Sequence, residues 1–302
     1  MDLRWCRVNE NKYTGKEIAV LTDAHGLLEP LEAALDDISS RGITEIYSLG
    51  DNIGVGPNPG EVVDLLSEYG VKSIAGNSED YVTLGIEPFS SYFDYNKIRS
   101  QEWTMSKLNE RQIGTIELYP HYFELLLGGK RLALCHFAND VRFDFKDNST
   151  WSYQKKINKG ETAYSQFLYT NSLASKKEID SIVNRLDADK AFFRGYVSAF
   201  KEPLFGGKTV DFYDAIIQGH VHFKLYEKGG NTDYFTIRAV GMAYGNDPID
   251  TASYVILKEK VNNQGFDVEE VLVKFDREKM EYAIMSSDGN MDMIKKFTNM
   301  RR

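Results

Sequence analysis

The chain has 302 residues, which is enough to bury a substantial core as one large domain with an insertion or as two small domains. Its formal net charge of −9 argues against a nucleic-acid polymer as partner, because neutralising backbone phosphates needs a basic face. No apolar run approaches the ~20 residues of a membrane span, and two cysteines fit a reducing cytoplasm better than a disulfide framework.

The first part of the chain predicts three strand–turn–helix units. Residues 1–15 are polar and aperiodic, and we interpret them as an N-terminal extension that is not a secretory signal. Buried-type apolar runs then alternate with helical spacing, which predicts a strand at 18–22, a helix at 28–39, a strand at 45–49, a helix at 60–69 and a strand at 71–75. This succession favours a sheet of parallel strands joined by right-handed crossovers.

The second part changes character. Residues 85–115 are helical at best, and a hairpin is expected at 122–127 and 131–135. The polar, aromatic and lysine-rich stretch at 138–208 indicates an inserted cap between two core segments, 16–137 and 209–302. In the second core segment we expect a buried strand at 215–218, an antiparallel run at 223–227, 234–240, 252–257 and 268–275, and a peripheral helix within 276–302.

Polar side chains stand at the ends of five predicted strands: Asp23 and His25, Asp51, Asn77, His136, and His220 and His222. Four of the five histidines of the chain belong to this set, and the fifth, His121, is expected in a surface turn. Each residue has an ordinary alternative, since the aspartates could cap helices, Asn77 could form a turn and His136 could be a satisfied core histidine. Together the alternatives are hard to sustain, because all seven donors would crowd one sheet edge by accident.

Imidazole, carboxylate and amide donors suit divalent ions such as Mn²⁺, iron and Zn²⁺. Seven donors are too many for one catalytic zinc, which uses about three protein ligands, but they suit two metals if one carboxylate bridges. A two-metal site clamps the attacking and leaving oxygens of a displacement at phosphorus. The sequence therefore predicts two divalent cations, Mn²⁺ or iron, with Zn²⁺ as the alternative.

These residues resemble the signature of calcineurin-like metallophosphoesterases, in the expected order: Asp23-x-His25, Gly50-Asp51-x-x-Gly54, Gly76-Asn77, His136 and Gly219-His220-x-His222. The resemblance covers residues 16–140 and 210–275, and the stretch at 50–59 is especially similar to the small bacterial phosphodiesterase branch, which includes dinucleoside-polyphosphate hydrolases. It implies an α/β fold, a four-layered α/β/β/α sandwich of two mixed sheets.

The resemblance also implies roles. Asp23, His25, Asp51 and His222 would hold one metal, and Asp51, Asn77, His136 and His220 the other, with a bridging hydroxide as nucleophile. The residues it assigns to catalysis are Asp51, Asn77 and His136. Near the substrate we expect Asn52, Ser78, Phe137 and, in a loosely matching glycine-rich loop, Tyr244.

Two positions depart from the family pattern. Ser78 stands where many members have a histidine that protonates the leaving oxygen, and Phe137 stands where the branch has glycine. A serine hydroxyl is a poor proton donor at neutral pH, which argues against phosphoserine and for phosphoanhydrides or activated diesters. The ring of Phe137 either stacks a nucleobase or, in the interpretation we favour, packs.

We therefore expect a phosphohydrolase acting on nucleotide anhydrides or diesters, with diadenosine tetraphosphate as the most concrete substrate and the aromatic cap holding a base. A serine/threonine protein phosphatase is the enzymatic alternative. A non-catalytic scaffold that kept the fold is the other alternative, although it would be expected to have lost ligands. No membrane partner is expected, and the sequence indicates no oligomeric state.

Overall fold

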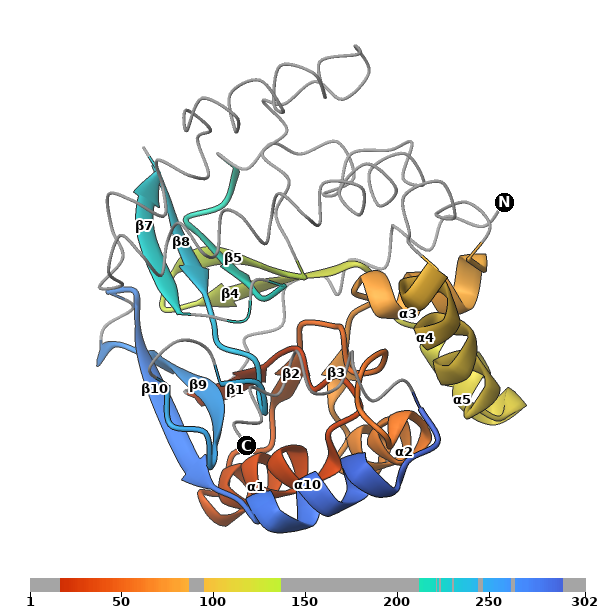
Figure 1. Cartoon of the computed structure of the whole chain (residues 1–302). Coiled ribbons are helices and arrows are strands. Elements are labelled where there is room, and N and C mark those ends of the chain that lie inside the picture. Colours follow the sequence, from red (N-terminus) through yellow and green to blue (C-terminus); the bar gives the residue numbers. More distant parts are fainter. Residues whose placement is uncertain are drawn as a thin grey trace, which may run out of the picture.

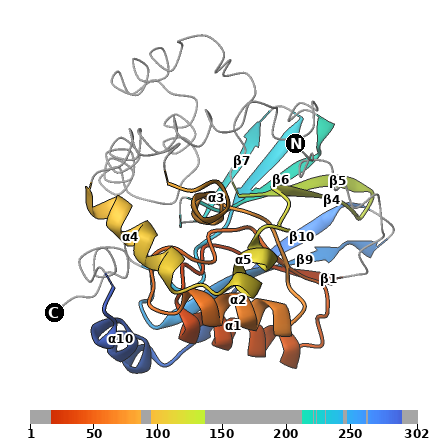
Figure 2. The same cartoon turned by 90° about the vertical axis from the view of Figure 1, so that its right-hand side faces the viewer.

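The computed structural model of the chain describes residues 17–86, 95–136, 212–220, 222, 224–229, 231–243, 247–261 and 264–289. In this part of the chain two five-stranded sheets face each other, and helices cover the outer side of one of them (Figure 1, Figure 2). The predicted extension at 1–15 and the predicted cap at 138–208 lie outside the described residues. None of the described helices is long and apolar enough to cross a membrane.

The first sheet has the order β10-β9-β1-β2-β3. Its strands are β1 (Glu17–Leu21), β2 (Ile46–Ser48), β3 (Lys72–Ser73), β9 (Thr251–Glu259) and β10 (Phe266–Lys274). Strands β1, β2 and β3 run parallel, as the strand–turn–helix units predict, and β9 joins β1 in antiparallel pairing. The carboxyl ends of β1, β2 and β3 therefore lie at one edge of the sheet.

Helices α1 (Leu28–Ser40), α2 (Pro59–Glu68) and α10 (Arg277–Ser286) lie on the outer side of the first sheet (Figure 1). The apolar positions Leu31, Leu35 and Ile38 follow helical spacing and are fully buried against β1, β9 and β10. Helix α10 contacts α1, so the predicted C-terminal helix is part of this layer.

The second sheet has the order β4-β5-β6-β8-β7. Its strands are β4 (Tyr122–Leu127), β5 (Lys130–Cys135), β6 (Ala215–Gln218), β7 (Leu225–Gly229) and β8 (Thr232–Thr236). The predicted hairpin is confirmed as β4–β5. The antiparallel run expected from 223 to 275 is confirmed within its two halves, where β7 pairs with β8 and β9 pairs with β10, but it is not continuous, because β8 pairs parallel to β6 and β9 joins the first sheet. Alternation of apolar and polar residues predicts a half-buried strand, but it does not predict which strand lies beside it in the sheet.

The main core lies between the sheets. In β1, Ile18 and Val20 face the second sheet, while Ala19 and Leu21 face the helices, and all four are fully buried. A strand covered on both faces reads as a continuous apolar run, which is why the sequence located β1 so clearly. Two mixed sheets with helices confirm the predicted α/β class, and the fourth layer over the outer face of the second sheet stays a prediction.

Three further helices, α3 (Asn77–Leu84), α4 (Tyr95–Ser106) and α5 (Glu110–Ile116), connect β3 to β4. They form a group of their own beside the strand ends (Figure 1). Helix α3 packs against both α4 and α5. The sequence predicted this stretch only as helical at best, and α3 itself was not expected.

The strand ends of the two sheets touch at Gly219, where a Cβ would lie 2.0 Å from Oγ1 of Thr22 and 2.6 Å from Oδ2 of Asp23. We expect Gly219→Ala to lower the free energy of unfolding by about 1–3 kcal/mol, because the overpacked sheets must separate. Gly114→Ala is the matched control, since nothing lies within 4 Å of its Cβ position in α5, and it should stabilise the protein by about 0.5–1 kcal/mol. Chemical denaturation measures both, and equal effects would contradict the close approach.

Candidate metal centre

The seven predicted ligands come from the carboxyl ends of five strands: Asp23 and His25 after β1, Asp51 after β2, Asn77 after β3, His136 after β5, and His220 and His222 after β6. The structure brings all seven together in two adjoining clusters. His220 is half-buried and the others are buried. The helix-cap alternative for the two aspartates is wrong, because the N-cap positions of α1 and α2 are Leu27 and Asn58.

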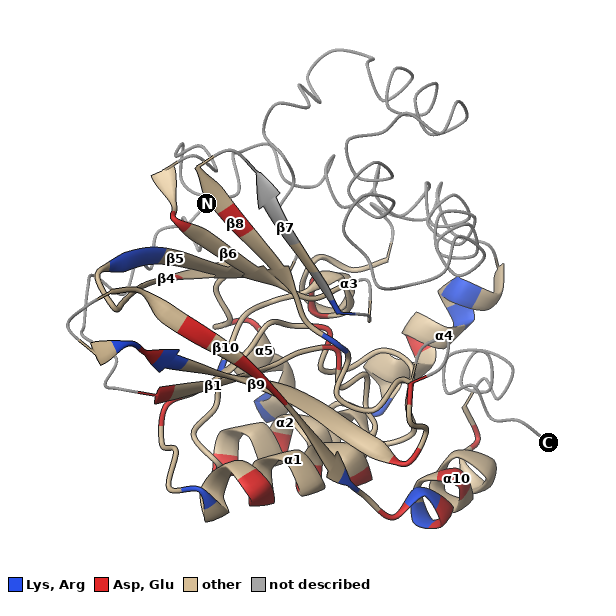
Figure 3. Ribbon diagram, turned by 90° about the vertical axis from the view of Figure 1, so that its left-hand side faces the viewer, with Lys and Arg blue, Asp and Glu red and all other residues tan. Residues whose placement is uncertain are grey.

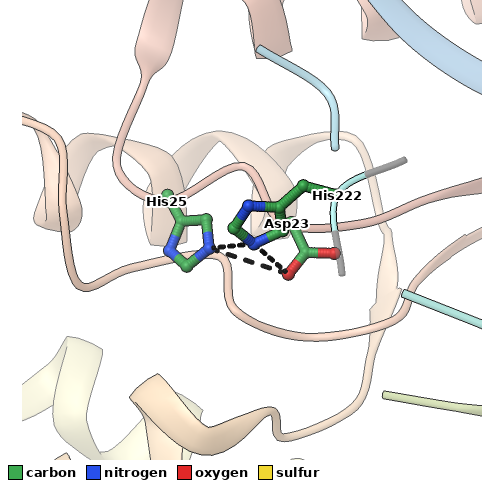
Figure 4. Close-up of side chains that lie close together, drawn as sticks. All are labelled: Asp23, His25 and His222. Carbon is green, nitrogen blue, oxygen red and sulfur yellow. Dashed lines mark hydrogen bonds and ion pairs between the residues drawn. The ribbon is translucent and has the colours of Figure 1, made fainter. Parts of the chain in front are cut away.

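Asp23, His25 and His222 form the first cluster (Figure 4). Oδ1 of Asp23 lies 3.3 Å from Nε2 of His222 and 3.6 Å from Nε2 of His25, and the two Nε2 atoms are 3.1 Å apart. Oδ2 of Asp23 accepts hydrogen bonds from Oγ1 of Thr22 and from the backbone N–H of His220. Oδ1, by contrast, is buried without a hydrogen-bond partner, which fits a cation at the point the three ligand atoms face.

Asp51, His136 and His220 form the second cluster, with the amide of Asn77 beside them. Nε2 of His136 lies 3.1 Å from both Nδ1 of His220 and Oδ1 of Asn77, and 3.6 Å from Oδ1 of Asp51. Nδ1 of His220 is 3.2 Å from the same amide oxygen. Two imidazoles, one carboxylate and one amide oxygen therefore converge here, which is a donor set suited to a divalent ion.

Asp51 lies between the two clusters. Its Oδ1 is 3.6 Å from Nε2 of His136, and its Oδ2 is 3.7 Å from Nε2 of His25 in the first cluster. The backbone N–H of Ser78 donates to Oδ1 at 2.8 Å and fixes the orientation of the carboxylate. With one oxygen toward each cluster, this carboxylate is placed to bridge two cations.

Backbone carbonyls set the tautomers of two ligand histidines. Nδ1 of His25 lies 3.2 Å from the carbonyl oxygen of Ile53, and Nδ1 of His136 lies 2.8 Å from that of Leu49. A carbonyl oxygen only accepts, so Nδ1 must donate, and in the neutral ring Nε2 carries a lone pair directed into its cluster. Metal-binding histidines are oriented in this way.

The charges of the site favour cations. Burial lowers the pKa of His25 to about 4 and that of His220 to about 3, so both rings are neutral near pH 7. Burial alone would raise the pKa of Asp23 and Asp51, but the neighbouring histidines hold both below their usual value, and both are ionised. Burial would likewise lower the pKa of His136, yet Asp51 and Asp23 raise it, which shows that this position favours positive charge.

The backbone is unusual at the ligand positions. Five non-glycine residues in the described part of the chain have positive φ: Asp23 (54°), His25 (50°), Asp51 (51°), His220 (70°) and His222 (66°). Each is a predicted ligand. Such conformations are unfavourable for residues with a side chain and persist only where the surroundings hold them, which is characteristic of functional sites.

The predicted substrate contacts are less well placed. Asn52 is fully buried, and its Oδ1 accepts a hydrogen bond from Oγ of Ser48 while its Nδ2 has no partner. The side chain of Ser78 is buried against Gly54. Phe137 and Tyr244 lie outside the described residues. Contact of these four residues with a substrate stays a prediction.

Two residues beside the site had no role in the sequence analysis. Glu79 is fully buried and accepts hydrogen bonds from three backbone N–H groups, one of them of Asp51. Its signal in the sequence is its place three residues after Gly76, the N-cap of α3, from which a glutamate can accept a hydrogen bond from the N-cap N–H. Lys97 lies in the first turns of α4, where the basic residues of that helix gather (Figure 3), and nothing in the sequence marks it.

His121 is not at the surface, and that expectation is wrong. The side chain is buried, and its Nε2 lies 2.9 Å from Oδ1 of Asp80, which is also buried. The preceding Pro120 accepts a hydrogen bond from the backbone N–H of Ala75, which draws the turn against the end of β3. This long-range contact buries a residue that local turn chemistry places outside.

Comparison with known proteins identifies the family of the chain. The sequence profile of the calcineurin-like phosphoesterases matches residues 16–224. The protein MJ0912 of Methanocaldococcus jannaschii, which is uncharacterized, is 36% identical over 136 residues, 45% of this chain and 53% of its own length. The chain thus spans about half the length of that curated relative.

Two solved structures share the fold at low identity. A hypothetical protein from Pyrococcus horikoshii, PH1004, has a TM-score of 0.61 at 15% identity and covers 93% of this chain and 97% of its own. A metallophosphoesterase from Sphaerobacter thermophilus has a TM-score of 0.55 at 17% identity and covers 94% of this chain and 98% of its own. With the profile match over more than half of its length, the chain belongs to the calcineurin-like phosphoesterase family.

Proposed function

We propose that the protein is a two-metal phosphohydrolase that cleaves anhydride or diester bonds of nucleotides, with a dinucleoside polyphosphate such as diadenosine tetraphosphate as its best substrate. One divalent ion is held by Asp23, His25, Asp51 and His222, and the other by Asp51, Asn77, His136 and His220. We place the reaction in the cytoplasm, because the chain has only two cysteines.

The donor set supports this assignment. Imidazole, carboxylate and amide ligands suit Mn²⁺ or iron, and such ions would supply Lewis-acid activation of the phosphoryl group and of the attacking water. The two ligand carboxylates offset only part of the charge of two divalent ions. The loaded site is therefore locally positive within an acidic chain, and it attracts phosphoryl oxygens.

The choice of substrate class depends on one observation, the serine that follows Asn77. Ser78 is buried against Gly54, and its backbone N–H is already bound to Oδ1 of Asp51. A serine hydroxyl gives up a proton poorly at neutral pH, so a leaving alkoxide of high pKa would depart slowly. A phosphate or nucleotide leaves as a stable anion and needs no proton, which favours anhydrides over phosphoserine.

Lys97 adds a further cation for an anionic substrate. Its Nζ lies 5.6 Å from the centre of the Tyr81 ring on α3, the helix that begins with Asn77. One turn further along α4, Nε2 of Gln101 donates to the carbonyl oxygen of Gly54, so this face of the helix lies against the ligand loop. The pKa of His25 is lowered mainly by burial, and the positive charge of Lys97 contributes a smaller lowering. We assign Lys97 to binding a substrate phosphate.

A metal-supplemented substrate panel tests the proposed function. With Mn²⁺, we expect the wild-type protein to hydrolyse diadenosine tetraphosphate faster than cyclic nucleotides and phosphopeptides. Asp51→Asn is the background control. Substitution of a residue that supports a metal ligand lowers activity roughly 10–100-fold, and Asp51→Asn should lower it further, because both metals would share this carboxylate. Faster turnover of phosphopeptides would favour a protein phosphatase, and full activity of a folded Asp51→Asn variant would rule out the two-metal site.

Lys107 provides a matched control for Lys97. It follows the last residue of α4, and its Nζ lies 5.3 Å from the centre of the Trp103 ring. We expect Lys97→Ala to lower kcat/KM for a polyphosphate substrate about 10–100-fold, the loss that corresponds to one charge-assisted hydrogen bond of ~1.5–3 kcal/mol. Lys107→Ala should leave kcat/KM unchanged. Steady-state kinetics decide, and equal losses in the two variants would contradict a contact specific to Lys97.

A further inference from the structure

The carboxylate of Glu79 accepts hydrogen bonds from three backbone N–H groups. Its Oε2 accepts from Asp51 at 2.9 Å and from Gly76 at 2.8 Å, and its Oε1 accepts from Asn52 at 2.8 Å. The side chain is fully buried. Capping of helix α3 accounts for the bond from Gly76 alone, since the other two donors belong to a loop 27 and 28 positions away in the sequence.

The three donors lie on the two loops that carry ligands at the ends of β2 and β3. These loops are in direct contact, because a Cβ at Gly50 would lie 2.4 Å from the backbone nitrogen of Gly76, and a Cβ at Gly76 would lie 2.4 Å from Oδ1 of Asp51. The N–H of Ser78 returns a hydrogen bond to Oδ1 of Asp51. Glu79 therefore joins the loop of Asp51 to the loop of Asn77 from behind the metal ligands.

A carboxyl group is the side-chain group that fits these donors. Three N–H groups need acceptors, and both carboxylate oxygens only accept. Glutamine would keep one oxygen but turn its NH₂ group toward one of the N–H donors. The bond from Asp51 also restrains a residue whose φ is 51°, a conformation that the backbone does not keep by itself.

We propose that Glu79 is a positioning residue that sets the place of Asp51 relative to Asn77 and thereby the affinity of the site for divalent metal. The proposal rests on the proposed two-metal function. Asp23 of the first cluster is held by hydrogen bonds that do not involve Glu79, from Oγ1 of Thr22 and from the backbone N–H of His220. The effect of Glu79 therefore falls mainly on the metal shared by Asp51 and Asn77.

Titration of the metal-free protein with Mn²⁺ by calorimetry tests this role. The wild type should bind two equivalents, and Glu79→Gln should bind one of them about 10–100-fold more weakly. Hydrolysis of an activated diester by the variant should need correspondingly more Mn²⁺ for half-activation, and saturating Mn²⁺ should restore kcat. A loss of fold would not be restored by metal, so this rescue separates positioning from folding.

Glu29→Gln is the matched control, because Glu29 is also a buried glutamate near a helix start and lies beside Lys279, away from the ligand loops. Its Mn²⁺ affinities should equal those of the wild type. Wild-type affinity at both sites in Glu79→Gln, or unfolding of both Glu79→Gln and Glu79→Ala in the metal-free state, would overturn the positioning role. Absence of Mn²⁺ binding by the wild type would instead overturn the proposed function.

Discussion

The structure depends on the convergence of imidazole, carboxylate and amide side chains at the ends of the strands. In the first cluster two ring nitrogens lie 3.1 Å apart, and the nearest carboxylate oxygen is buried without a hydrogen-bond donor. In the second, two further ring nitrogens face the amide oxygen of Asn77 at 3.1 and 3.2 Å. The two carboxylates are held ionised, and they raise the pKa of His136, so positive charge is favoured among these side chains. A fold that builds this arrangement twice is organised to hold cations.

The backbone carries the strain of this arrangement, and the packing between the sheets compensates for it. All five ligands with positive φ follow strands whose apolar side chains are fixed in the core. The loops are then tied to one another: the N–H of Asp23 donates to Gly50, that of His25 donates to Asp51, and that of Gly219 donates to His136. Each bond links the ends of two different strands. The ligands therefore keep their positions through the rigidity of both sheets, not through local turn preference.

The sequence predicted the parts of this protein that local patterns encode. Strand β1 is covered on both faces, so its apolar run was clear in the sequence. The polar residues at the strand ends were correctly expected to lie close together, because strand ends meet at one edge of a sheet. It failed where pairing or burial is decided at long range. The parallel pairing of β8 with β6, the buried position of His121 and the contact of Gln101 on α4 with Gly54 all depend on partners distant in the sequence. Glu79 illustrates this limit of sequence-based prediction. Its hydrogen bond from Gly76 follows from local spacing, whereas its hydrogen bonds from Asp51 and Asn52 do not.

The short stretch from Gly76 to Glu79 combines several tasks that cannot be changed independently. Gly76 allows the close approach to Asp51, Asn77 supplies an amide oxygen, and Ser78 donates its N–H to the shared carboxylate. Glu79 connects the two loops, because it accepts hydrogen bonds from backbone N–H groups of both. Because these residues share partners, substitutions among them should be non-additive. A histidine introduced at position 78 as a proton donor would have to fit against Gly54 without moving the backbone N–H that holds Asp51. The preference for a leaving group and the geometry of the metal site therefore depend on the same turn of helix α3.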